Sequence, residues 1–394
     1  MQIVLLSIMA CAILLSTRTA AGYVSRQRMA AHHSKLSMTF LDDLTRAFST
    51  LSGGAKDSKF YTVGITGSSG LLGTALIDEL VNQQALNGKP IRIVKLTRSE
   101  AMDGSQLGED STGIVSLPWN PKGSNPESVI DSAALENIDA IVHLAGENVA
   151  TGLGSLGFLG IRPWTDAKKA EIVNSRVGPT EALAKAIAAS KTPTTFVAAS
   201  GVGIYGGDFV GSNKAAVDET MDTSTTTGFL AKVSRAWEEA TIPATGKNRV
   251  VNARLGVVMS KNGGALGKLY PIFFLGGGGN VGSGNQYFTF ISARDAARAL
   301  IHTLSTPSLN GPVNICAPAP CTNAEFTSAF GKVLNRPTIL PLPAFVVSAL
   351  FGEMGDEMLL GGVRATPGKL AKSGFQFSHP TIVEALQSAV DETI

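Results

Sequence analysis

Charged residues are scarce in this sequence of 394 residues: they make up 16% of it, and the formal net charge at pH 7 is only +2. Because no stretch holds a dense run of Lys or Arg, the sequence lacks the basic footprint of a nucleic-acid-binding protein. Cys11, Cys316 and Cys321 are too few for a disulfide framework or a zinc site. Cys316 and Cys321 could pair, but we expect two reduced, part-buried thiols. The five histidines, at positions 32, 33, 143, 302 and 379, show no metal-ligand spacing, so we predict no metal site.

Long hydrophobic runs are missing as well. The apolar run Ile3–Leu15 is too short to span a bilayer comfortably, since that takes roughly 20 residues. Small residues follow at Thr19–Gly22, as a signal-peptidase site requires, and then a basic, Ser-containing stretch with no acidic residue before Asp42. This pattern predicts that residues 1–57 are a targeting leader and linker, with a signal and a transit-like segment in series, and that the destination is a plastid. Simple secretion, mitochondrial import and an uncleaved anchor are the alternatives. For the rest of the chain, no charge pattern or basic amphipathic helix indicates membrane binding.

The stretch Tyr61–Gly73 predicts a strand, a tight turn and a helix. Its apolar, β-prone residues end in glycines, after which Leu and Ala recur at helical spacing. Gly67, Gly70 and Gly73 let the backbone turn sharply, approach a pyrophosphate and pack the helix on the strand, and the helix N-terminus offers free N–H groups to that phosphate. A tight turn without a ligand is the alternative. We interpret the stretch as a dinucleotide-binding turn.

The next predicted strand, Ile91–Leu96, ends in Thr97-Arg98-Ser99. A cofactor with a free ribose 2′-hydroxyl usually meets an acidic residue at this point, whereas a 2′-phosphate favours Arg. The acid is missing here, and the planar guanidinium of Arg98 can grip a phosphate in bidentate fashion. The sequence therefore predicts NADP(H) rather than NAD(H), with a solvated surface arginine as the alternative.

Predicted strands alternate with helical segments as far as Leu255. Further strands are expected at 113–117, 138–146, 195–200 and 249–255, and helices at 167–177, 179–189 and 229–240. This alternation predicts an α/β fold, a Rossmann-type doubly wound parallel sheet with a smaller mixed C-terminal region on the substrate side. We place the nucleotide-binding domain at 58–310 and a C-terminal extension at 311–394. The glycine-rich segments 263–264, 276–279 and 282–284 are expected to be flexible loops, either covering a substrate or serving as plain linkers. We expect His143 to be a buried, hydrogen-bonded histidine rather than a base.

Several motifs resemble those of the extended short-chain dehydrogenase/reductases, the nucleotide-sugar epimerase group. Thr66-Gly-x-x-Gly-x-x-Gly73, the strand end Leu144-Ala145-Gly146, the pair Tyr205-Gly206 and Arg254-Leu-Gly-Val-Val258 carry this likeness. From about residue 60 to its end the chain is similar to one atypical branch, the epimerase family 39U member 1 or YfcH-like proteins. The similarity to this branch rests on His143-Leu-Ala-Gly-Glu-Asn148, Asn174-Ser-Arg-Val177, Gly263-Gly-Ala-Leu266, Gly282-Ser-Gly-x-Gln286 and a C-terminal extension typical of the branch.

The resemblance implies NADP(H) as the cofactor and a small-molecule substrate such as a nucleotide sugar or a small carbonyl compound. It also adds Glu171, Arg176 and Val258 to the cofactor site; for Glu171 and Arg176 an ion pair on a helix surface is the alternative. Together, the turn and the resemblance predict the following cofactor-binding residues: Gly67, Ser68, Gly70, Leu71, Leu72, Gly73, Thr97, Arg98, Leu144, Ala145, Gly146, Glu171, Arg176 and Val258.

The resemblance breaks down at the catalytic positions. Extended members use a Tyr-x-x-x-Lys pair, in which the Lys lowers the pKa of the phenol so that the Tyr can pass a proton while hydride moves to or from the nicotinamide. Alignment places Leu230 and Ser234 at these two positions and Gly201 at the supporting Ser or Thr. The neighbouring groups that could move a proton are Tyr205 first, then Ser200, Lys232 and Lys168, and packing beside the substrate is the alternative role for Tyr205. The sequence thus leaves two functions open: an NADP(H)-dependent, epimerase-like oxidoreductase of unknown substrate, or a catalytically inert NADP(H)-binding protein that signals redox state to, or serves as a scaffold for, a partner.

Overall fold

The computed structural model describes residues 58–99, 108–109, 113–149, 163–206 and 215–392 of the chain. The predicted leader, residues 1–57, lies outside these described residues. Within them, no helix is long and apolar enough to cross a membrane.

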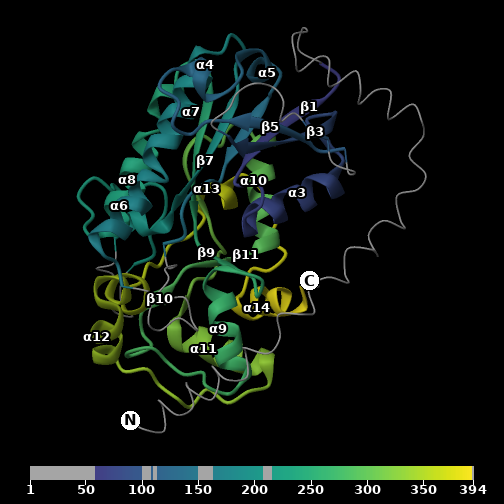
Figure 1. The fold of residues 1–394 in the computed structure, drawn as a ribbon. Coiled ribbons are helices and arrows are strands. Elements are labelled where there is room, and N and C mark those ends of the chain that lie inside the picture. Colours follow the sequence, from purple (N-terminus) through teal and green to yellow (C-terminus); the bar gives the residue numbers. More distant parts are fainter. Residues whose placement is uncertain (1–57, 100–107, 110–112, 150–162, 207–214, 393–394) are drawn as a thin grey trace.

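A nine-stranded sheet runs through the molecule (Figure 1). Its strands are β1 (Tyr61–Thr66), β2 (Ala85–Leu86), β3 (Lys89–Arg98), β4 (Gly108–Glu109), β5 (Val115–Trp119), β6 (Ala140–His143), β7 (Thr195–Gly201), β8 (Arg249–Leu255) and β12 (Gly311–Ile315). Their order is β12-β8-β7-β6-β1-β3-β5-β4, with β2 beside β3, and the neighbours from β12 to β5 are parallel. The chain moves outward from β1 to β3 and β5, then returns to β6 on the other side of β1. In such a doubly wound sheet ligands bind beyond the carboxyl ends of the strands at this reversal.

Helices cover both faces of the sheet (Figure 1). On one face α3 (Leu71–Gln83) packs beside α10 (Ala293–Ser305), and their apolar stripes, including Leu76, Leu80 and Leu300, are buried against the strands. The other face is covered by α4 (Pro126–Val129), α5 (Ser132–Glu136) and α7 (Val177–Ala189), with Leu183 and Ile187 in the core. The two further helices on this side are α6 (Asp166–Asn174) and α8 (Phe229–Glu239). The predicted Rossmann-type fold is confirmed.

A second, smaller core lies beyond the carboxyl ends of the strands. It is enclosed by α9 (Gly264–Phe274), α11 (Asn323–Leu334) and α14 (Ile382–Asp391), together with the short strand pairs β9 (Val257–Met259) with β11 (Phe290–Ser292) and β10 (Tyr287–Phe288) with β13 (Cys321–Thr322). The rings of Phe273 and Phe330 pack there at 4.6 Å between centroids. Helix α11 begins with the capping box that Thr322 and Glu325 form. Cys316 and Cys321 are both buried and free.

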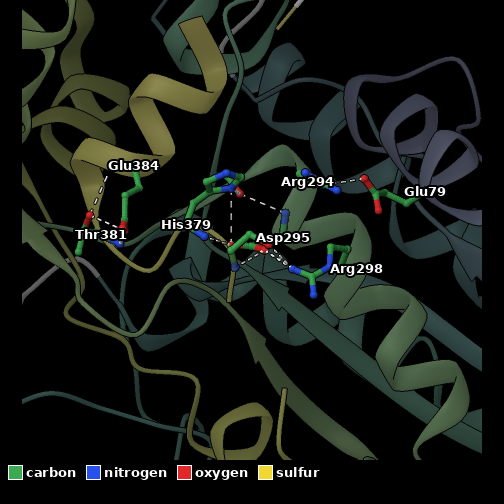
Figure 2. Close-up of polar contacts among 9 residues, drawn as sticks. Glu79, Arg294, Asp295, Arg298, His379, Thr381 and Glu384 are labelled. Atoms are coloured by element: carbon green, nitrogen blue, oxygen red, sulfur yellow. Dashed lines mark hydrogen bonds and ion pairs between the residues drawn. The ribbon is translucent and has the colours of Figure 1, made fainter. Parts of the chain in front are cut away.

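The C-terminal segment is attached to the sheet domain by a buried carboxylate (Figure 2). Asp295, in the first turn of α10, is fully buried and accepts hydrogen bonds from the backbone N–H of Ser378 at 3.0 Å and of His379 at 2.8 Å. Arg298 donates to the same carboxylate at 3.0 Å. These contacts fix the approach to α14, whose N-terminus is closed by Thr381 and Glu384 in a capping box. The remaining helices are α12 (Ala344–Gly355), a π-helical turn at Asp356–Leu360, α13 (Gly368–Lys372) and the 3₁₀ turns Val202–Tyr205 and Ile242–Ala244.

Candidate functional site

The turn after β1 is so tight, and lies so close to the end of β6, that two of its glycines have no room for a side chain. Gly67 has a positive φ of 65°, and a Cβ built on it would lie 2.8 Å from the carbonyl carbon of Leu144. A Cβ on Gly73 would lie 2.2 Å from the carbonyl oxygen of Gly67. The N–H of Gly70 donates to that same oxygen at 3.0 Å and closes the turn. The structure therefore brings these three glycines together with Leu144 and Ala145, and leaves bare backbone at the start of α3.

A buried polar network holds the strand ends beside the turn. Thr66 Oγ1 accepts hydrogen bonds from the N–H of Leu144 at 3.1 Å and of Ala145 at 3.3 Å, and contacts His143 Nδ1 at 2.7 Å. His143 Nε2 lies 3.0 Å from Thr180 Oγ1 on α7. His143 is fully buried, and this burial lowers its pKa to about 4, so the ring is neutral at physiological pH. The prediction of a buried, hydrogen-bonded histidine is confirmed.

Thr97 and Arg98 end β3, the parallel neighbour of β1. Thr66 pairs with Leu96 in the ladder, so Arg98, which pairs with Trp119 of β5, extends two residues beyond the end of β1 at the edge where the glycine turn lies. Arg98 is exposed, and within the described chain its guanidinium takes part in no ion pair. A cation with this placement is free to meet an anionic group held above the turn.

The start of α9 also borders the turn, a feature that the sequence analysis did not predict. A Cβ on Gly263 would lie 3.1 Å from Leu71 Cδ1, and Gly264, with a φ of 62°, lies next to the same side chain. The N-caps of α3 and α9 are Gly70 and Gly263, and neither N-terminus has a capping side chain. Two sets of unpaired N–H groups therefore adjoin at one place, which is favourable for an anion. The pair Gly263-Gly264, expected to belong to a flexible loop, instead forms the start of α9.

Glu171 and Arg176 do not form the ion pair weighed as their alternative role. Glu171 instead pairs with Lys168 at 3.0 Å, and Lys168 also contacts Glu147 at 2.9 Å. Burial lowers the pKa of Lys168 and the two carboxylates raise it; the carboxylates prevail, and the pKa is raised. Arg176 is buried: it donates to the carbonyl of Glu147 at 2.6 Å and its guanidinium lies 4.9 Å from the ring centre of Trp237. Burial lowers the pKa of Arg176 to about 10.

The other predicted cofactor residues lie around the turn or at the ends of the strands. Ser68 lies within the turn, where its Cα is 2.8 Å from the Cβ built on Gly73. Gly146 lies against the side chain of Arg176, Leu72 packs on the core beneath α3, and Val258 belongs to β9, with its carbonyl oxygen 3.7 Å from the Cβ built on Gly264.

Residues 63–316 match the model of the NAD dependent epimerase/dehydratase family, and residues 342–389 match a domain of unknown function, DUF1731. The chain belongs to the epimerase/dehydratase family. Among curated relatives, the epimerase family protein Mb2239 of Mycobacterium bovis is 43% identical over 82% of this chain and 96% of its own length. The epimerase family protein SDR39U1 homolog of Arabidopsis thaliana, described as chloroplastic, is 31% identical over 87% of this chain and 90% of its own.

Solved structures of the family share this fold. The human epimerase family protein SDR39U1, determined with NADPH, aligns with a TM-score of 0.68 at 32% identity, over 84% of this chain and all of the human chain. The nucleoside-diphosphate sugar epimerase of Corynebacterium glutamicum aligns with a TM-score of 0.59 at 28% identity, over 88% of this chain and 62% of its own. The resemblance inferred from the motifs is confirmed.

Tyr205 and Ser200, the candidate proton-transfer residues of this epimerase-family chain, both belong to a buried polar cluster. The Tyr205 hydroxyl donates to Asn314 Oδ1 at 2.8 Å and accepts from Arg254 Nη1 at 3.0 Å. Ser200 Oγ donates to Glu238 at 2.8 Å, and Glu238 is also paired with Arg254 at 2.8 Å. Tyr205 is fully buried, and burial raises its pKa to about 12 despite the opposing effect of Arg254. In this arrangement each hydroxyl is already engaged by the protein.

The structure brings together the three positions that alignment assigns to the family's catalytic residues. A Cβ on Gly201 would lie 3.8 Å from Ser234 Oγ, and Leu230 lies on the same face of α8, one turn earlier, with its Cβ 3.2 Å from the Cβ built on Gly203. None of these side chains can both hold and release a proton at neutral pH in the manner of a Tyr supported by a Lys. Of the other candidates, Lys232 is exposed on α8 and Lys168 is held between two carboxylates.

Proposed function

We propose that this chain binds NADP(H), with the pyrophosphate over the turn at Gly67–Gly73 and the 2′-phosphate at Arg98. The observation that carries the proposal is the bare backbone of this turn, where a Cβ on Gly67 or Gly73 would collide with neighbouring backbone. Two uncapped helix N-termini adjoin there, and Arg98 ends the adjacent strand without an acidic residue. The residues present fit the cofactor, and the relative determined with NADPH supports the same choice. The bound cofactor would supply a hydride donor or acceptor.

Binding of NADPH and NADH to wild type and Arg98→Ala tests this proposal. We expect Arg98→Ala to weaken NADPH binding on the order of tenfold or more, because a charge-assisted contact contributes about 1.5–3 kcal/mol, and to leave NADH binding nearly unchanged. Arg294→Ala is the matched control, since Arg294 is a surface arginine paired with Glu79 on the outer side of α3 and α10. An unchanged ratio of NADPH to NADH affinity in Arg98→Ala would contradict the assigned role.

For the reaction, we propose an epimerase-like oxidoreductase that acts on a nucleotide sugar or a small carbonyl compound. A second candidate is an inert NADP(H)-binding protein, which the presence of Leu230 and Ser234 at the catalytic positions favours. The two candidates differ only in turnover. A screen of nucleotide sugars and small carbonyl compounds for NADPH oxidation or NADP⁺ reduction separates them. Turnover of any of these substrates would exclude the inert binder. A rate that falls in Tyr205→Phe would assign Tyr205 to the reaction, and a rate unaffected by that change would remove it.

We further propose that the C-terminal extension covers the substrate side of this site. Support comes from Glu357, whose carboxylate accepts hydrogen bonds from the N–H groups of Phe229 and Leu230 at 2.6 and 3.0 Å. Apolar side chains of the same part of the extension also form a cluster with Trp164. The predicted boundary at 311 coincides with the start of β12, a strand of the main sheet, so the covering part begins after it.

Finally, we propose that residues 1–57 direct the chain to a plastid, on the strength of the two-part leader and the chloroplastic relative. Imaging of these residues fused to a fluorescent protein tests this directly. A signal confined to the plastid is expected, and a reticular, extracellular or mitochondrial signal would overturn the assignment.

A further inference from the structure

Helices α9 and α11 lie together at one end of the molecule (Figure 1), and large apolar side chains of this end are exposed to solvent. Phe274 and Leu275, at the end of α9, are 45% and 53% exposed, and Ile339, in the extended segment after α11, is 78% exposed. Leu340 beside it is also exposed. A soluble protein rarely shows such side chains as a contiguous group without a binding partner, although single exposed ones are common.

These side chains form one surface because the two segments are hydrogen-bonded to each other. Arg336 Nε donates to the carbonyl of Phe274 at 2.7 Å, and its guanidinium lies 5.0 Å from the centre of the Phe274 ring. Leu340 N–H donates to the carbonyl of Gly278 at 3.1 Å, so the segment 336–340 runs along the loop that follows α9. We call this surface, made of Phe274, Leu275, Lys332, Arg336, Ile339 and Leu340, the α9–α11 face.

The charge of the α9–α11 face has one sign. Lys332 and Arg336 are exposed and border a hollow of about 400 Å³ at the C-terminal end of α11. Arg336 donates to backbone carbonyls, and neither cation forms an ion pair within the described part of the chain. The two stretches that build the face, 241–294 and 326–352, contain no Asp or Glu at all. The cations are therefore available to an anionic partner.

We propose that the α9–α11 face docks on an anionic membrane surface, with Lys332 and Arg336 at the lipid phosphates and Phe274, Leu275 and Ile339 among the head groups. Two observations favour this occupant. A second copy of the chain in a two-fold dimer would place cations opposite cations. The most exposed apolar side chain projects from an extended segment rather than lining a groove, which suits a deformable lipid surface better than a rigid protein. No single run of sequence shows this pattern, because the face is assembled from segments about 60 residues apart.

Vesicle sedimentation with the full chain tests the proposal. We expect binding to vesicles of phosphatidylcholine mixed with phosphatidylglycerol, little binding to phosphatidylcholine alone, and loss of the difference at high salt. Lys332→Gln with Arg336→Gln should lower the partition coefficient on the order of 30-fold, since each cation near an anionic surface contributes roughly 1 kcal/mol. Lys332→Gln alone, which leaves the hydrogen bonds of Arg336 intact, should lower it about fivefold. Lys185→Gln with Lys191→Gln is the control of equal charge change on another surface.

The apolar contribution and the alternatives are separated by a second pair of variants. Ile339→Ser should reduce vesicle binding several-fold, whereas Ile242→Ser, at a residue 59% exposed elsewhere, should not. A dye attached at position 339 should move to an apolar environment on vesicles, and the same dye at position 242 should not; this distinguishes docking of the face from binding through the leader. The proposal is overturned if the variants of the face bind vesicles as well as their control variants do, or if neutral vesicles bind the chain as well as anionic ones. It is also overturned if Ile339→Ser abolishes a dimer or a complex with an acidic protein while vesicle binding is unchanged.

Discussion

Gly73 has no space for a side chain, and this gives the nucleotide turn its clearest single-residue test. A Cβ there would lie 2.2 Å from the carbonyl oxygen of Gly67, so Gly73→Ala must push α3 away from the turn. We expect a loss of about 2–3 kcal/mol in the free energy of unfolding, in the range of an overpacked site, together with weaker NADPH binding. Gly178→Ala in α7 is the control: apart from the neighbouring backbone of its own helix, no atom would lie within 4 Å of the added Cβ, and the change should be neutral or stabilising. Denaturant unfolding and equilibrium binding measure both effects. Equal stability of the two variants would contradict the packing argument.

For single residues, the sequence was sufficient where a residue's role follows from its neighbours in the chain, and insufficient where the role depends on a distant segment. Gly67 and Gly73 are spaced along one turn, so their roles follow from neighbouring residues. The pair Gly263-Gly264 borders Leu71 only because β9 places it there, nearly 200 residues later in the chain. Likewise, nothing near Tyr205 in sequence indicates that Asn314 and Arg254 surround its hydroxyl.

His143 makes stability depend on pH in a defined interval. Burial lowers its pKa from the ordinary 6.5 to about 4 in the folded chain. Between these two pH values the unfolded chain binds a proton at His143 that the folded chain does not. The free energy of unfolding is therefore unaffected by this group above pH 6.5 and decreases by about 1.4 kcal/mol per pH unit as the pH falls towards 4. His143→Gln should be less stable at pH 7 but should lack this part of the slope. Unfolding free energies measured from pH 7 to pH 4 test this, and parallel curves for the two proteins would show that His143 is not the titrating group.

Among the elements, α8 depends on a residue from the C-terminal extension for its N-terminus. Its N-cap is Gly228, which has no side chain to offer, and Glu357 accepts the N–H groups of Phe229 and Leu230 instead. Glu357→Ala should therefore cost about 1–2 kcal/mol, the effect of losing a helix cap. Glu353→Ala, which removes only an ion pair with Lys169 at the surface, should cost under about 1 kcal/mol. Amide exchange at the start of α8 should increase in the first variant alone; faster exchange in both would mean that the extension is loosened generally.

β8 and α8 agree with their predicted ranges almost to the residue, whereas β5 (Val115–Trp119) lies two residues later than the predicted 113–117, β6 (Ala140–His143) is shorter than the predicted 138–146, and α9 was not predicted. β8 begins and ends where the apolar run at 249–255 does, and α8 differs from its predicted range by one residue. Helix α9 contains Gly267 and Pro271, both of which disfavour helix. It forms because its apolar side chains, Phe273 among them, are buried against α11 and α14. Such tertiary stabilisation cannot be read from local propensity.

In the whole molecule, the C-terminal segment returns to the sheet domain. The sequence could not predict this contact, because Asp295 and His379 are 84 residues apart and belong to no shared pattern. This contact also bears on the nucleotide site. The end of α14 holds the segment before Gly263, through a hydrogen bond of 2.6 Å from Ser260 Oγ to Glu392 and another of 2.6 Å from Lys261 Nζ to the carbonyl of Val390. The extension and the turn at Gly73 are therefore linked through one loop.

Asp295→Asn tests whether this link stabilises the molecule as a unit (Figure 2). The amide keeps one acceptor oxygen but turns an NH₂ group either towards Arg298 and the N–H of Ser378, which share Oδ1, or towards the N–H of His379, which contacts Oδ2, so at least one part-buried donor loses its partner. We expect a cost of about 1–3 kcal/mol and faster amide exchange through α14. Glu79→Gln, which weakens only the exposed pair with Arg294, should cost under about 1 kcal/mol and leave α14 unchanged. If α14 exchanges equally fast in both variants, or if neither variant is less stable than wild type, then α14 is held by its apolar contacts with α11 alone, and the buried carboxylate does not couple the extension to the sheet.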